Sequence, residues 1–158
     1  MDNMTMTHYM ELLASNQPWN LILFMAIPVI LAEFIAVTEL YVLFTRNTSG
    51  GLKRWNRYAS MFVGVYFLGI FVYLFSTAVV PLTTQGLWRG PFDVIAVGFY
   101  LLGVVPLVGM ALIDSGLVLR GQEEQVKLKN HAVMVGIFLV VAHIAMIFGM
   151  LSPHLLMA

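Results

Sequence analysis

The chain has 158 residues, of which 60% are hydrophobic and 10% are charged, and its formal net charge at pH 7 is zero. A soluble domain carries about 25% charged residues, so this composition excludes an ordinary soluble domain and indicates a membrane protein. Zero net charge argues neither for nor against nucleic-acid binding, but a membrane protein is not expected to bind nucleic acid. The absence of cysteine excludes disulfides and thiol chemistry.

Four apolar segments predict four transmembrane helices within a single transmembrane domain, residues 1–158. Each segment exceeds the roughly 20 residues that cross a bilayer as a helix, and none alternates like a strand of a membrane barrel. The predicted fold class is therefore all-α, a polytopic four-helix membrane bundle. The helices are expected at about 19–45, 58–80, 94–119 and 130–151.

The basic residues predict the orientation of these helices. Seven of the eight Lys and Arg residues lie in the connections 46–57 and 120–130, whereas Arg89 lies between the second and third helices. Cytoplasmic loops carry the excess of Lys and Arg, so both termini should be outside. We expect a multi-pass protein of the bacterial inner membrane with periplasmic termini. The first apolar run is too long for a signal peptide, so it should remain as a helix.

The first helix contains the stretch ILAEFIAVTEL, residues 30–40, which carries two carboxylates inside an apolar run. A charge at the bilayer centre costs roughly 2.5 kcal/mol or more. Glu33 and Glu39 are about 240° apart around a helix, so they should face different neighbours. The stretch resembles the first helix of small multidrug-resistance transporters, in which one membrane glutamate binds protons and cationic drugs in turn. That resemblance ends here, because the second and third helices lack the family's pattern, the chain is longer and Glu39 is an additional carboxylate.

Helical rise assigns a depth to each ionisable residue. Glu33 and His143, from the first and fourth helices, should meet near the bilayer midplane. Glu39 and Asp114, from the first and third helices, should share a layer nearer the cytoplasm. This layer requires a shared proton or cation between the carboxylates, or ion pairs of Asp114 with nearby basic residues. We assign Glu39, Asp114 and His131 to a proton or ion relay.

Methionine and histidine form a second pattern. The N-terminal segment reads MDNMTMTHYM, and on the fourth helix His143 and Met146 lie one turn apart, with Met25 expected at the same depth as Met146. Thioether and imidazole suit Cu(I), whereas carboxylate and imidazole suit Fe(II), Zn(II) or a proton. Methionine is also a common apolar filler of helices. The predicted metal ligands are Met4, Met6, His8, Met10, Met25, Glu33, His143 and Met146.

Three functions follow from these patterns. The favoured one is transport or delivery of a transition-metal ion, copper or iron, through the intramembrane Glu/His/Met site. The alternatives are a proton-coupled transporter of an organic solute and a haem- or quinone-associated subunit of a larger membrane complex, with haem the less expected cofactor. No enzyme motif is present, and the expected partners are the lipid bilayer and either further copies of the chain or other membrane subunits. Metal analysis and a visible spectrum of the purified protein would distinguish the three.

Overall fold

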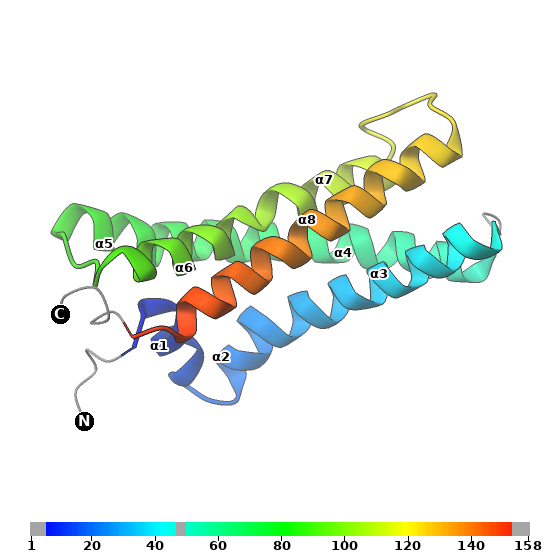
Figure 1. Ribbon diagram of the computed structural model, residues 1–158. Coiled ribbons are helices and arrows are strands. Elements are labelled where there is room, and N and C mark those ends of the chain that lie inside the picture. The colour runs from blue at the N-terminus through cyan, green and yellow to red at the C-terminus, as the bar shows by residue number, and fades with distance from the viewer. Residues whose placement is uncertain (1–5, 47–49, 153–158) are drawn as a thin grey trace. The chain divides into compact units, whose positions relative to one another are not determined.

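The computed structural model describes residues 6–46 and 50–152, and every regular element in this part of the chain is helical (Figure 1). The all-α prediction is therefore confirmed. The elements in chain order are α1 (His8–Ala14), α2 (Trp19–Leu21), the π-helix η2 (Ile22–Ala26), α3 (Ile27–Thr45), α4 (Gly51–Leu74), the π-helix η3 (Phe75–Val79), α5 (Val80–Gln85), α6 (Pro91–Leu102), α7 (Val104–Asp114) and α8 (Glu124–Met150).

Consecutive elements join into four helical spans that are long and apolar enough to cross a membrane, as predicted. The spans are Trp19–Thr45, Gly51–Gln85, Pro91–Asp114 and Glu124–Met150. The third span ends at Asp114 rather than near residue 119, because the chain turns there with positive φ at Gly116 and Leu119. The second and fourth spans begin well before their apolar runs, because the polar residues 51–57 and 124–129 are also helical.

Prolines explain where the spans depart from regular α-helix. The π-helix η2 ends two residues before Pro28, η3 ends two residues before Pro81, and the break between α6 and α7 at Gly103 precedes Pro106. Proline lacks an N–H and crowds the preceding turn, so the turn widens or breaks. One carbonyl left without its helical donor is that of Phe24, which accepts a hydrogen bond from the Tyr100 hydroxyl.

Contacts within the chain define two compact units, each built from separated segments. The first unit comprises residues 1–27, 70–103 and 140–158, and the second comprises residues 28–69 and 104–139. The single transmembrane domain stays a prediction.

The second unit consists of α3, the first part of α4, α7 and the first half of α8. Its core is apolar: the side chains of Ile35, Val63, Leu107 and Met110 are fully buried. The helices α4 and α7 approach closely, because a Cβ atom placed on Gly64 would lie only 2.5 Å from the Cβ atom of Ala111. Small residues permit such close packing of membrane helices.

The first unit contains the short helix α1, which is held in place by buried side chains. Thr7 caps α1 by accepting a hydrogen bond from the Met10 N–H, and its hydroxyl donates to the Gly149 carbonyl at 2.7 Å. Tyr9 is buried with its ring centroid 5.1 Å from that of Tyr100. Burial raises the pKa of Tyr9 to about 12, so its phenol is neutral at physiological pH.

Candidate functional site

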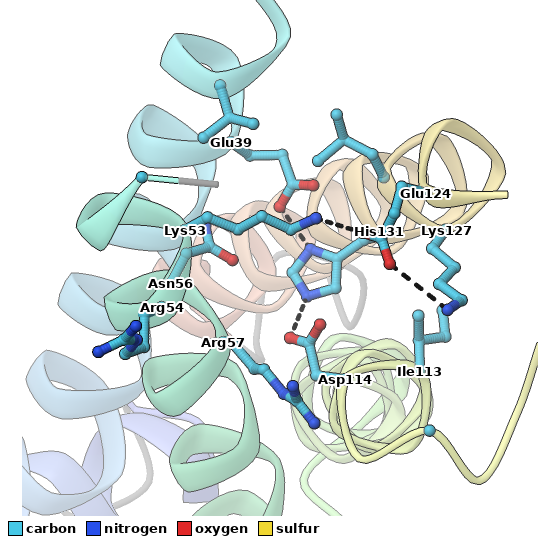
Figure 2. A pocket seen from close by; sticks show the side chains of 14 residues that line it. Glu39, Lys53, Arg54, Asn56, Arg57, Ile113, Asp114, Glu124, Lys127 and His131 are labelled. Atoms are coloured by element: carbon cyan, nitrogen blue, oxygen red, sulfur yellow. Dashed lines mark hydrogen bonds and ion pairs between the residues drawn. The ribbon is translucent and has the colours of Figure 1, made fainter. Parts of the chain in front are cut away.

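A buried histidine between two carboxylates is the main polar feature of the second unit. The Nδ1 atom of His131 on α8 contacts Oε2 of Glu39 on α3, and its Nε2 atom lies 2.9 Å from Oδ2 of Asp114 on α7. Figure 2 shows the two carboxylates on opposite sides of the imidazole ring. Glu39 and His131 are each only 3% exposed. We call Glu39, His131 and Asp114 the His131 triad.

Helical periodicity brings these side chains together. The buried positions of α3 include Ala32, Ile35, Glu39 and Val42, so Glu39 lies on the packed stripe of its helix. His131 is the first member of the buried stripe of α8 and is followed at helical spacing by Val135 and Phe138. Asp114 is the last residue of α7, where the helix dipole disfavours a carboxylate. Its contact with His131 offsets that unfavourable position.

Further polar contacts lie beside the triad. Together with the triad they form a polar layer to which all helices of the second unit contribute. The Ser60 hydroxyl of α4 lies 3.2 Å from Nε2 of His131. The Asn56 side-chain amide donates to Oγ1 of Thr38 at 2.6 Å and to the Ile35 carbonyl at 3.1 Å. No buried side-chain nitrogen or oxygen in the described part of the chain lacks a partner. The layer is therefore a satisfied polar network, which is the condition for burying such groups.

The two contacts of His131 define how many protons the triad holds. Each contact is a hydrogen bond only if a proton lies on it, so the three groups together carry two protons. They are either an imidazolium between two carboxylates or a neutral imidazole with one protonated carboxyl. Both states have a net charge of −1. With one proton fewer, a carboxylate oxygen would face a nitrogen lone pair and one contact would become repulsive.

The triad lines a pocket of about 410 Å³, which we call the His131 pocket. Lys53 on α4 forms an ion pair with Oε2 of Glu124 on α8, and Lys127 lies 3.5 Å from the other oxygen of Glu124. Basic side chains outnumber the acidic ones in the lining. The charged lining residues are Glu39, Asp114 and Glu124 on the acidic side and Lys53, Arg54, Arg57 and Lys127 on the basic side.

Comparison with known proteins identifies the family. A family model described as a family of unknown function, DUF6803, matches residues 4–158. The chain belongs to the DUF6803 family. No curated protein and no solved structure matches it significantly.

The three residues assigned to a relay from the sequence, Glu39, Asp114 and His131, are brought together. Glu39 and Asp114 do not face each other across a bare cation or a single shared proton, because the imidazole lies between them. In the described residues Asp114 forms no ion pair with Lys127, which contacts Glu124 instead. The relay role itself stays a prediction.

The predicted midplane pair has a different status. Glu33 belongs to the second unit and is exposed on α3, as its 240° separation from the buried Glu39 requires. His143 belongs to the first unit, as do the half-buried Met25 and Met146. The pairing of Glu33 with His143 and the intramembrane metal site therefore stay predictions. Within residues 6–46 and 50–152, no three His, Asp or Glu side chains are placed to hold one metal ion.

The N-terminal ligand candidates lie partly in the first unit. Met4 is outside the described residues, whereas Met6 is exposed and Met10 is half-buried. His8 contacts the fully buried Asp93 twice, through its backbone N–H at 2.7 Å and through Nδ1 at 2.5 Å.

Arg89 also holds α1 in the first unit. Arg89 forms an ion pair with Glu11 at 2.5 Å and donates to the Met6 carbonyl at 2.8 Å. The sequence did not predict Asp93 or Arg89 as site residues. A signal for Asp93 existed, because a carboxylate in the first turn after Pro91 is typical of a helix N-terminus.

Proposed function

We propose that this protein is a proton-coupled transporter of a small solute, in which the His131 triad carries the proton and the His131 pocket binds the solute. One observation carries the proposal: a buried histidine, on a helix long and apolar enough to cross a membrane, is held between two carboxylates and lines a pocket. Ionisable groups within membrane spans are costly and mark proton and ion pathways. Histidine is the side chain that ordinarily exchanges protons near neutral pH.

Ser60 supports reversible proton exchange at this site. When a proton leaves the contact between His131 and Asp114, Nε2 becomes an acceptor that repels the carboxylate. The Ser60 hydroxyl, 3.2 Å from Nε2, can then donate to it. Asp114, whose side chain is 20% exposed against 4% for His131, is the member of the pair that can turn toward the pocket. Loss of the proton is thereby linked to a rearrangement of the pocket lining.

The test is solute-driven proton movement in proteoliposomes that contain a pH-sensitive dye. A panel of small anions, cations and neutral solutes is applied without an imposed pH gradient. We expect at least one solute to change the internal pH, and His131→Gln to reduce that rate at least about tenfold. Glu123→Gln is the matched control, because it removes an exposed carboxylate that does not line the pocket, and it should keep most of the rate.

Three results would contradict this proposal. The first is solute uptake by the wild-type protein without any change of internal pH, and the second is no uptake of any solute on the panel. The third is a folded His131→Gln protein that still changes the internal pH at the wild-type rate.

Metal handling is the second candidate, and the environment of His8 favours it. Histidines that ligate metals commonly bond a carboxylate or carbonyl through their other ring nitrogen. Asp93 contacts Nδ1 of His8, so Nε2 is the ring nitrogen that is left for a ligand. The exposed Met6 lies two residues away in the chain. The softness of this pair suits Cu(I).

We expect Met6→Leu to weaken Cu(I) binding about tenfold in a competition assay with a chromogenic chelator, with Met134→Leu as the control. Equal affinities of both variants and the wild type would reject the site.

We also propose that the protein resides in a bacterial inner membrane with both termini outside. The support is the excess of basic residues in segments 46–57 and 120–130. In a protein with four spans, these two segments lie on the same side of the membrane, opposite the termini. A reporter that is active only outside the cytoplasm should work when fused after Ala158 and fail when inserted at Gly50. The reverse pattern would invert the topology.

A further inference from the structure

The charges that line the His131 pocket are unequally paired. Glu39 and Asp114 both contact His131, and Glu124 contacts both Lys53 and Lys127. All three carboxylates of the lining are therefore engaged. In the described part of the chain, Arg54 and Arg57 form no ion pair with any carboxylate.

We propose that the His131 pocket binds a small organic or inorganic anion, a carboxylate or phosphate compound, through Arg54 and Arg57 of α4. The anion would be the solute of the proposed transporter. Only the transport of the anion rests on the proposed function, whereas its binding does not. Guanidinium groups bind carboxylate and phosphate through paired, charge-assisted hydrogen bonds. Both arginines belong to the first two turns of α4 and line the same pocket as His131. Figure 2 shows Arg57 extending to the side of Asp114, whereas Arg54 is directed away from the imidazole and reaches the same ligand by turning its long side chain.

The size and composition of the pocket suit such a ligand. Its volume of about 410 Å³ holds a small organic anion together with several waters, since a water in the liquid takes about 30 Å³. The lining has a net charge of about +2, because the His131 triad carries −1, Glu124 carries −1 and the four basic side chains carry +4. Apolar lining from Val42, Ile113 and Leu128 can pack on the carbon skeleton of an organic anion.

Binding of an anion and binding of a proton should favour each other. Every helix of the second unit presents groups to the pocket: Glu39 from α3, Lys53 and the arginines from α4, Asp114 from α7, and Glu124, Lys127 and His131 from α8. An anion at the arginines adds negative charge near the triad, so the triad holds its proton more strongly. By reciprocity, the protonated triad binds the anion more strongly, and anion affinity should fall as pH rises. This is the coupling that a symporter of an anion and a proton requires.

The same two arginines could instead bind the phosphate of an anionic lipid, because cytoplasmic basic residues attract such lipids. The shared chemistry is an anionic oxygen group, and the exposure of both side chains is compatible with either source. The proposal commits to the free anion, because the arginines line the same pocket as the triad, whose proton an anion can stabilise.

The experiment is isothermal titration of the full-length protein in nanodiscs made only of zwitterionic lipid. The probes are succinate and inorganic phosphate, with neutral succinamide and cationic putrescine as size-matched controls. We expect at least one anion and neither control to bind, with proton uptake on binding and weaker affinity at higher pH. Arg54→Gln and Arg57→Gln should each weaken anion binding about tenfold.

Two variants separate specific binding from general charge and folding effects. Arg120→Gln removes an exposed arginine that does not line the pocket, and it should leave affinity within about twofold of wild type. Arg57→Lys keeps the charge but loses the planar fork, so it should bind more weakly than wild type and more strongly than Arg57→Gln. Equal affinity of Arg54→Gln, Arg57→Gln and the wild type would overturn the proposal.

The lipid is tested by native mass spectrometry in nanodiscs that contain phosphatidylglycerol. Retention of that lipid, lost in the double arginine variant, without any signal for a soluble anion would overturn the solute site. Proton movement that accompanies only a cationic or neutral solute would overturn the anion assignment. It would still be consistent with a proton-coupled transporter. Anion binding that depends on the arginines but moves no proton would uphold this inference and remove the proton-coupled function.

Discussion

We expect His131→Leu to lower the free energy of unfolding of the protein by about 3–5 kcal/mol, the usual cost of removing one partner from a buried ion pair. The variant leaves Glu39, which is only 3% exposed, with neither its hydrogen-bond donor nor a compensating charge. Asp114 loses the contact that offsets the unfavourable end of the α7 dipole. The measurement is a denaturant titration in detergent micelles, followed by circular dichroism.

Two comparisons identify the cause of that loss. Glu39→Gln should cost less than His131→Leu, because His131 keeps Asp114 and Ser60 as partners. The combination of Glu39→Met, His131→Leu and Asp114→Asn should recover most of the stability, since a buried ionic group can often be replaced by apolar residues. Glu124→Gln breaks only exposed pairs and should change stability by less than about 1 kcal/mol. A destabilisation by Glu124→Gln as large as that of His131→Leu would show that burial of the triad is not what matters.

Stability and proton coupling separate the structural from the functional role of the triad. If the triad only holds helices together, the restored apolar combination should behave as a functional protein. If the triad carries the proton, the same combination should fold and yet move no proton with the solute. The folded, inactive outcome is the one that we expect.

Gly64→Ala should lower the free energy of unfolding by about 2–3 kcal/mol, a large effect for one methyl group. The added Cβ would lie 2.5 Å from the Cβ of Ala111 and 2.7 Å from the carbonyl oxygen of Leu107, and neither atom belongs to a flexible side chain. The helices α4 and α7 would have to separate, which loosens the packing that places Asp114. The same denaturant titration measures the change.

The control for that prediction lies on the same helix. Gly69→Ala adds a methyl group where nothing lies within 4 Å, so it should be neutral or stabilise α4 by up to about 1 kcal/mol. Adding Ala111→Gly to Gly64→Ala removes one of the two close contacts and should recover part of the loss. Equal effects of Gly64→Ala and Gly69→Ala would mean that close packing of α4 on α7 is not a source of stability.

The sequence was informative about the spans because hydrocarbon imposes a simple rule on it. An apolar run that crosses the bilayer must satisfy its backbone internally, so its length alone indicates a helix. Periodicity also separated the two glutamates correctly: Glu39 is buried on the packed stripe of α3, and Glu33 is exposed. Both conclusions depend on residues near one another in the chain, which a single helix brings into a known geometry.

Helix ends and partners across helices were harder to predict. The fourth apolar run suggested a helix start near residue 130, which would place His131 at its end, but α8 begins at Glu124 and His131 lies about two turns inside. Charged residues can extend a membrane helix beyond the hydrocarbon, so hydropathy marks the bilayer and not the first turn. Likewise, α7 ends at Asp114, earlier than its apolar run suggested.

By itself, then, the sequence determined that this is an all-α chain with four helices able to span a membrane, and that Glu33 and Glu39 face different directions. Only the tertiary structure decided that His131 lies between Glu39 and Asp114, that Ser60 contacts the same ring, and that two arginines share the pocket. The physical reason is that helical rise gives a residue's depth, whereas its partners depend on how each helix is rotated about its axis. That rotation is set by packing contacts such as Gly64 on Ala111, which join residues 47 positions apart in the chain.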